Sequence, residues 1–252
     1  MIKNQWLTSA LIAVMLSGSA VTQASSDIAE ESTGSSWQQE EDISALQRAA
    51  EQGDAAAQFY LGVRYANGED VAQNDVKAVA WYRKAAKQGY VKAQFNLGWM
   101  YASGNGVPQD SVQAAAWFRK AAELGDAKAQ TNLGWMYTNG NGVPQDLTQA
   151  MKWYHKAAEQ GDERAQTNLG MNYANGEGVA QDDVQAVKWY RKAADQGVAT
   201  AQYLLGFMYE TGRGVSQDDA QAMSLYRQAA VQGYADAQYR FDALNARLRL
   251  GE

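Results

Sequence analysis

Few residues in this 252-residue sequence have the chemistry that a catalytic site needs. His155 is the only histidine, and the chain has no cysteine. A nucleophile normally needs a base beside it, and histidine is the commonest base. Arginine occupies the equivalent place in neighbouring segments, as at Arg119 and Arg191, so we expect His155 to be a solvated outer-face side chain. Without cysteine, a thiolate nucleophile and a thiolate zinc site are excluded.

Two other patterns suggest ligand sites but have simpler explanations. Gly-x-Gly motifs such as Gly104-Asn-Gly106 could suggest a phosphate-binding loop, yet no strand precedes them and no Gly-Lys-Ser follows. The acidic pairs Asp182-Asp183 and Asp218-Asp219 stand where helices are expected to begin, and negative charge is favourable there. We therefore predict turns and caps, with no catalytic residue, no metal and no cofactor.

The elements that carry these residues repeat with a period of 36. Within one period Ala57, Leu61 and Tyr65 are spaced by four residues, which indicates the apolar face of a first helix. A second helix follows, with Trp81 and Tyr82 at helical spacing before an Ala-Ala pair. That pair recurs at Ala49-Ala50, Ala85-Ala86, Ala121-Ala122, Ala157-Ala158, Ala193-Ala194 and Ala229-Ala230.

Glycine and aspartate mark the ends of these helices. Gly62 lies inside the first helix, where glycine costs about 1 kcal/mol relative to alanine, so we expect the partner helix backbone to approach it closely. Asp110 with Gln113 predicts a capping box at the start of the second helix. Asn74 with Lys77 is the weakest copy. Gly89 and its equivalents suit a C-terminal cap, and Asp70 stands where other copies have a loop glycine.

The N-terminus has the three-part layout of a signal peptide. A lysine at position 3 precedes an apolar run from Trp6 to Leu16, and small and polar residues follow. The run is shorter than the roughly 20 residues of a membrane span, so we expect export with cleavage after Ala24, or alternatively after Ala20, and no membrane insertion of the mature chain. An uncleaved anchor is the competing interpretation.

The charge of the chain is concentrated near its beginning. Six acids and no base lie between Ser25 and Leu46, within a formal net charge of −6. Residues 25–41 are predicted to be an acidic disordered linker. Nucleic-acid binding needs clustered basic residues, and the nearly neutral remainder of the chain offers no such excess. We expect a monomeric periplasmic or secreted protein that does not bind nucleic acid.

The repeated columns resemble the Sel-one-like repeat family, the 36-residue relatives of tetratricopeptide repeats. The resemblance rests on Ala-Gln-x-x-Leu-Gly-x-x-Tyr, Gly-x-Gly-Val-x-Gln-Asp and Ala-x-x-Trp-Tyr-Arg-Lys-Ala-Ala, and covers residues 42–250. It implies an all-α, α/α solenoid, a right-handed superhelix of antiparallel helix pairs that serves as an adaptor. It also implies bacterial envelope or host-contact roles. Some exported members resemble cysteine-rich proteins linked to β-lactam binding, but the paired cysteines are missing here, so that activity is not carried over.

The periodicity gives a complete division of the chain into segments. The two ends match only half a repeat each, as expected of polar caps on a solenoid. We predict a signal peptide at 1–24, the linker at 25–41, a capping half-repeat at 42–53, repeats at 54–89, 90–125, 126–161, 162–197 and 198–233, and a capping helix at 234–252.

One stripe of the first helices is the candidate binding surface, because it lies opposite the apolar face and varies between copies. By resemblance to tetratricopeptide domains, it lines the concave groove. The asparagine amides can donate to and accept from a peptide backbone, the cations can bind acidic groups, and the tryptophans offer large contact surfaces. The stripe comprises Lys92, Asn96, Trp99, Lys128, Asn132, Trp135, Arg164, Asn168 and Met171.

Packing between neighbouring first helices is the competing explanation of this stripe. Trp81, Trp117, Trp153 and Trp189, in contrast, fall on the core face and are expected to pack. The function that we predict is an exported scaffold that binds a protein or peptide and is not an enzyme. The alternatives are a spacer without a groove ligand, and a cell-wall or β-lactam-directed enzyme using scattered carboxylates such as Glu177 and Glu210.

Overall fold

The computed structural model describes residues 43–250, which form twelve α-helices and no strand. The first of two compact units ends at Tyr90 and the second begins at Val91. The predicted all-α solenoid of helix pairs is confirmed. The helices are α2 (Ile43–Glu51), α3 (Ala55–Asn67), α4 (Asp75–Lys87), α5 (Val91–Ser103), α6 (Ser111–Glu123), α7 (Ala127–Asn139), α8 (Leu147–Glu159), α9 (Glu163–Asn175), α10 (Asp183–Asp195), α11 (Ala199–Thr211), α12 (Asp219–Val231) and α13 (Ala235–Leu250).

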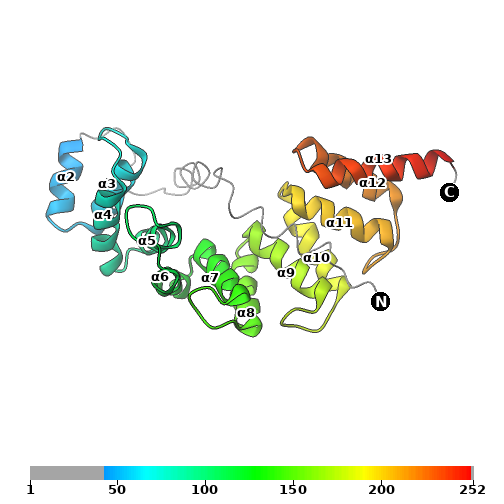
Figure 1. Cartoon of the computed structure of the whole chain (residues 1–252), viewed down its shortest axis with the longest axis horizontal. Coiled ribbons are helices and arrows are strands. Elements are labelled where there is room, and N and C mark those ends of the chain that lie inside the picture. Colours follow the sequence, from blue (N-terminus) through cyan, green and yellow to red (C-terminus); the bar gives the residue numbers. More distant parts are fainter. Residues whose placement is uncertain (1–42, 251–252) are drawn as a thin grey trace. The chain divides into compact units, whose positions relative to one another are not determined.

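Within each unit, every helix packs against the next helix along the chain (Figure 1). In the first unit α3 contacts both α2 and α4, and in the second unit the same pairwise packing runs from α5 to α13. Helix α2 corresponds to the second helix of a repeat and α13 to the first helix of a repeat, so each of them forms half a repeat. The predicted signal peptide and linker lie outside the described residues. No helix between residues 43 and 250 combines the length and the apolar character needed to cross a bilayer.

The caps of the second helices correct one prediction. The Asp110 carboxylate accepts from the backbone N–H groups of Val112 and Gln113, both at 3.0 Å. The returning half of a capping box is not made, because the Asp110 N–H donates to the Tyr101 carbonyl at 2.9 Å. The same backbone bond recurs at the other second helices of complete repeats. This explains why Asn74, which accepts from the Lys77 N–H at 2.9 Å, caps α4 without a glutamine at position 77.

The glycine inside each first helix makes room mainly for an aromatic ring, which corrects a second prediction. A Cβ atom on Gly62 would lie 2.7 Å from the Tyr82 ring, whereas the Ala78 carbonyl of the partner helix would be at an ordinary contact distance of 3.4 Å. A Cβ atom on Gly134 would lie 2.8 Å from the Tyr154 ring. On Gly98 it would lie equally close to the Phe118 ring. Tyr154 and Phe118 are buried core residues of the second helices. The glycine column therefore lets a ring lie directly on the first helix.

The second glycine of the loops that follow α7, α9 and α11 packs on the preceding repeat. Gly142 has a φ of 71°, and a Cβ atom there would overlap the backbone carbonyl of Ser111 at the start of α6. Gly178 and Gly214 make equivalent contacts. In the first repeat Asp70 adopts a φ of 58° and its carboxylate lies 3.2 Å from the Arg64 guanidinium. The turn thus survives the change to aspartate, as the tolerance of aspartate for this conformation led us to expect.

Buried glutamines link consecutive repeats. Gln130 on α7 is 3% exposed, and its amide donates to the Ala122 carbonyl of the preceding helix at 3.0 Å. Its own carbonyl accepts from the Gln160 amide at 2.8 Å. Pairs equivalent to Gln130–Gln160 are Gln58–Gln88, Gln166–Gln196 and Gln202–Gln232. In the second repeat Leu124 stands in the column of Gln160 and is 58% exposed. The second repeat therefore has no side-chain donor at this position.

Candidate functional site

The predicted binding stripe runs along α5, α7 and α9 of the second unit, one stripe position per helical turn. The side chains of Lys128 and Arg164 are exposed, whereas Asn96 is only 9% exposed. The amide function expected of this column therefore rests chiefly on Asn132 and Asn168. Asn132 and Asn168 are of intermediate exposure, as are Lys92, Trp99, Trp135 and Met171.

The two stripe tryptophans combine packing with exposure. Trp99 and Trp135 both pack against the core cluster that contains Phe118 and Leu133, and Trp135 also contacts the next cluster. Each ring nevertheless keeps part of its surface accessible. The packing explanation of the stripe therefore applies to one part of each ring, and the rest of its surface can still contact a ligand.

His155 on α8 is not the solvated outer-face residue that its column predicts. Its Nε2 atom lies 3.1 Å from the Tyr173 hydroxyl of the next repeat, and the edge of its ring meets Trp189. Arg119 and Arg191 donate to the equivalent tyrosine hydroxyls at 2.8 and 2.9 Å. Residues in this column thus form a hydrogen bond to a tyrosine of the next repeat, and His155 forms that bond in place of arginine. The tyrosine partner was not identified from the sequence, although the 18-residue spacing is constant.

The half-buried position of His155 predicts a pH dependence of stability. Burial lowers the pKa of His155 below its ordinary value, and the nearby Lys188 lowers it further against the opposing effect of Glu159. The unfolded chain therefore binds this proton at a higher pH than the folded chain. The free energy of unfolding should fall as the pH decreases through the ordinary pKa of histidine and down to the lowered one.

Urea titrations at pH 7.5 and at pH 5 measure this effect. We expect the wild-type protein to lose more stability between the two pH values than His155→Gln does, because the carboxylates common to both proteins cancel in the comparison. Equal losses would show that His155 does not titrate differently on folding.

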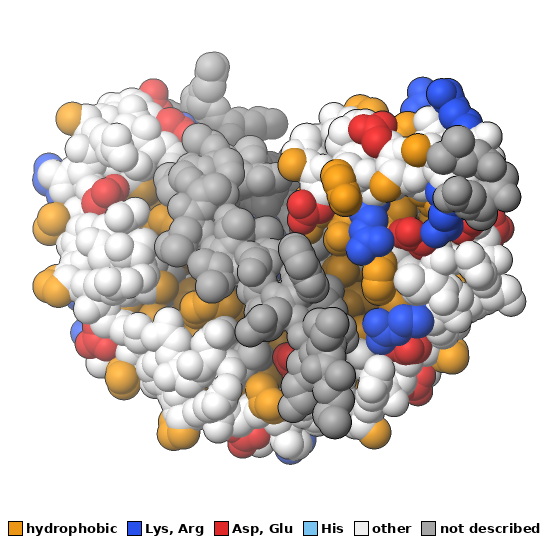
Figure 2. All heavy atoms as spheres, turned by 45° about the vertical axis from the view of Figure 1, so that its right-hand side comes forward, with side chains coloured by type: hydrophobic (Ala, Val, Ile, Leu, Met, Phe, Trp, Pro, Cys, Tyr) orange, Lys and Arg blue, Asp and Glu red, His pale blue; other side chains and the backbone are white. Residues whose placement is uncertain are grey.

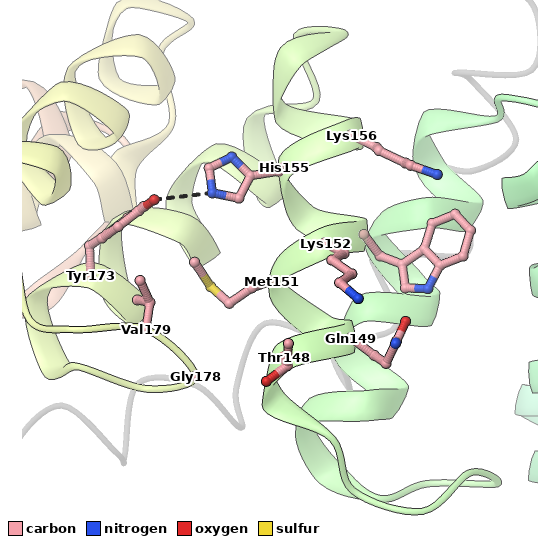
Figure 3. Close-up of a pocket in the computed structure, with 10 residues that line it drawn as sticks. Thr148, Gln149, Met151, Lys152, His155, Lys156, Tyr173, Gly178 and Val179 are labelled. Carbon is pink, nitrogen blue, oxygen red and sulfur yellow. Dashed lines mark hydrogen bonds between the residues drawn. The ribbon is translucent and has the colours of Figure 1, made fainter.

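His155 also borders an open surface pocket of about 480 Å³. Figure 3 shows Met151 of α8 opposite Val179 of the loop after α9, below the hydrogen bond between His155 and Tyr173. Lys152, Lys156 and Trp153 line the same pocket along α8. Of the four tryptophans expected in the core, Trp189 is buried, whereas Trp81, Trp117 and Trp153 are half-buried with a lysine ammonium over each ring.

The carboxylates that could have supported catalysis have structural partners. Glu210 accepts a hydrogen bond from the Tyr226 hydroxyl at 2.6 Å and pairs with Arg240 at 3.4 Å. Glu177 accepts from the Asn175 amide at 3.2 Å. Within residues 43–250, no three acidic or histidine side chains gather as a metal site.

Arginine–aspartate contacts across repeats were not predicted from the sequence. The Arg213 guanidinium donates hydrogen bonds to both carboxylate oxygens of Asp183, at 2.6 and 3.0 Å. It also donates to the Ala174 carbonyl. Near the C-terminal helices Arg247 pairs with Asp219 at 3.1 Å. Figure 2 shows basic and acidic side chains close together on the side that carries these helices. The only signal in the sequence is that Arg213 is basic where the other loops have asparagine or glutamate.

The sequence pattern of the Sel1 repeat matches this chain in six segments. One partial match covers residues 46–54, and five full matches cover residues 55–90, 91–126, 127–162, 163–198 and 199–234. The chain belongs to the Sel1 repeat family. Sel1 repeat solenoids generally serve as protein-interaction scaffolds.

Two solved Sel1 repeat structures are similar to this chain. One is a protective antigen present in uropathogenic Escherichia coli strains, with 43% identity and a TM-score of 0.77 over 80% of this chain. This chain spans only 43% of that protein's length. The other is a Sel1 repeat protein from Oxalobacter formigenes, with 38% identity and a TM-score of 0.71, which covers 75% of this chain and 77% of that one. Among curated proteins, none matches.

Proposed function

We propose that this protein is an exported adaptor that binds an extended segment of another protein along the stripe of α5, α7 and α9. The observation that supports it best is the combination of Trp135, which is half-buried, with the exposed cations Lys128 and Arg164 on the same face of consecutive first helices. Large amphipathic rings with adjacent cations are typical of binding hot spots. The general role of the Sel1 family supports the same function.

The chemistry of the stripe favours a peptide in extended conformation. Asn132 and Asn168 are 36 residues apart in sequence and occupy the same place in consecutive repeats. An amide side chain can donate to a backbone carbonyl and accept from a backbone N–H at once. A row of such amides can therefore hold a backbone without dictating its sequence, while Trp99 and Trp135 supply apolar contact area.

Charge reversal on the stripe tests the proposal. We expect Lys92→Glu with Lys128→Glu to lose a partner that the wild-type protein, starting at Ser25, captures from envelope extract. The reversed charges would repel acidic groups of that partner, and like charges in contact cost binding free energy. The control is Lys84→Glu with Lys120→Glu, which makes the same charge change on the exposed side of second helices.

Mass spectrometry of the captured proteins compares the variants. Loss of one partner from the stripe variant alone supports binding along α5 and α7. If both variants retain every partner, the stripe is not the binding surface. If neither the wild-type protein nor a variant captures anything, the spacer alternative is favoured, and the packing of Trp99 and Trp135 on the core is then their whole role.

Export is the second part of the proposal. It rests on the layout of residues 1–26, and the similarity to a protective antigen supports it because an antigen that protects must be accessible to the immune system. We expect the chain recovered from a bacterial envelope fraction to begin at Ser25, which N-terminal sequencing would check. Replacing the small residues Thr22 and Ala24 by bulky ones should block cleavage. A cytosolic chain that keeps Met1 would contradict export.

A further inference from the structure

At the junction of the third and fourth repeats, three columns of the repeat change residue type close to one another. In a repeat protein the fold dictates most columns, so residues that depart from their column have another cause. Three departures occur close to Met151: His155 for arginine, Asn172 for methionine and Thr148 for valine. In the other four copies the first column holds Arg83, Arg119, Arg191 and Arg227. The second holds Met100, Met136 and Met208, with Arg64 in the first copy, and the third holds Val76, Val112 and Val184, with Ala220 in the fifth.

The three departures meet at one place in the structure, the pocket beside α8. His155 and Thr148 line it directly, and the buried Asn172 amide lies 3.2 Å from the Met151 sulfur, which is part of the pocket wall. Imidazole is shorter than an arginine side chain, so the change at 155 leaves space that a guanidinium would occupy. The adjacent Trp189 is 5% exposed, and its indole N–H has no hydrogen-bond partner among the described residues.

The charged side chains that line the pocket are basic. Lys152 and Lys156 line it from successive turns of α8, and none of the described residues that line it is acidic. Neither lysine forms an ion pair with another described residue. The Lys156 ammonium lies over the Trp153 ring, 4.5 Å from its centre. Met151 and Val179 provide apolar surface on the side of α8 that faces Tyr173, and Lys156 extends from the other side of the helix (Figure 3).

We propose that this pocket binds a small organic carboxylate with an apolar body, such as an aryl or branched-alkyl acid. The carboxylate pairs with Lys152 and Lys156, and the apolar body lies against Met151 and Val179. Pockets of several hundred Å³ that combine an apolar wall with a few polar groups are the usual form of a small-molecule site. The site is formed by α8, α9 and the loop after α9, so it is additional to the proposed peptide-binding stripe.

The single histidine makes the test specific. The imidazole signals of His155, the only histidine in the chain, are followed by NMR while 4-phenylbutyrate is added to the full chain. We expect a saturable shift with a Kd of about 1 mM, the range expected for a ligand of this size. The amine of matching shape, 4-phenylbutylamine, should leave the signals unchanged. An unchanged imidazole with the acid, or equal shifts with the amine, would overturn the proposal.

Matched variants show whether the lysines select the carboxylate. We expect Lys152→Gln with Lys156→Gln to weaken binding about fivefold, as for the loss of partly exposed charge pairs. Lys84→Gln with Lys120→Gln, the same change on two other second helices, should have no effect. Far-ultraviolet circular dichroism confirms that each variant is folded. If the first pair binds as tightly as wild type, the pocket recognises apolar surface alone and the assignment of a carboxylate is wrong.

Discussion

Gly142→Ala should destabilise the protein by about 3 kcal/mol or more. Two costs add at this position. A φ of 71° disfavours any residue with a Cβ atom by about 1 to 2 kcal/mol. The Cβ atom would also overlap the backbone carbonyl of Ser111, which cannot rotate away as the end of a side chain could, and overpacking of this kind typically costs a further 1 to 3 kcal/mol.

Gly161→Ala is the matched control for this change. Gly161 has a φ of 98°, but nothing lies within 4 Å of a Cβ atom placed there. We expect urea unfolding to show only the backbone cost, about 1 to 2 kcal/mol. Since repeats in a solenoid couple only to their neighbours, the extra loss in Gly142→Ala should appear at the junction of α6 with the loop that contains Gly142. Equal losses in the two variants would mean that this loop does not pack on the preceding repeat.

Gln130→Met should cost about 1 to 2 kcal/mol although methionine is similar in length. The change removes the hydrogen bond from the Gln130 amide to the Ala122 carbonyl and the bond that its carbonyl accepts from Gln160. Both groups on Gln130 are buried, and a hydrogen bond of this kind contributes about 1 kcal/mol, more when its loss leaves a buried group unsatisfied.

A double-mutant cycle with Gln160→Met isolates the bond between the two glutamines. Gln160 is exposed, so its replacement alone should cost less than the replacement of Gln130. Because the double variant loses the shared bond only once, its cost should be smaller than the sum of the single costs, by about 0.5 to 1 kcal/mol. Additive costs would show that the Gln130–Gln160 bond contributes nothing to the stability of the junction.

The sequence was sufficient for the fold because each column repeats. Leu61 and Tyr65 indicate a helix face weakly by themselves, but their recurrence every 36 residues makes the period and the helix pairs unambiguous. The exposed side of the first helices followed from the same columns, and Lys128 and Arg164 are indeed exposed. Asn96 is more buried than Asn132 and Asn168 of the same column, and no pattern within one helix reveals this difference.

Contacts between repeats could not be predicted in the same way. Gln130 belongs to a column that recurs in every repeat, but glutamine is usually a surface residue, so recurrence alone does not identify the groups that it bonds. The partner of His155 is Tyr173, on a different helix, and a helical period describes the faces of single helices rather than the places where two helices meet. The same reason explains the two corrected predictions at Gly62 and Asp110, where the contact comes from a ring or carbonyl of a neighbouring element.

The most direct test of the adaptor proposal compares two sides of the protein in one experiment. A photo-crosslinking residue is placed at Asn139, the exposed last residue of α7 one helical turn beyond Trp135 of the stripe, or at Val112, which is 63% exposed on the second helix α6. Both proteins are incubated with envelope extract and irradiated. Our account predicts a partner crosslinked from position 139 and not from position 112. A partner crosslinked only from position 112, or from neither position, would contradict binding along the stripe.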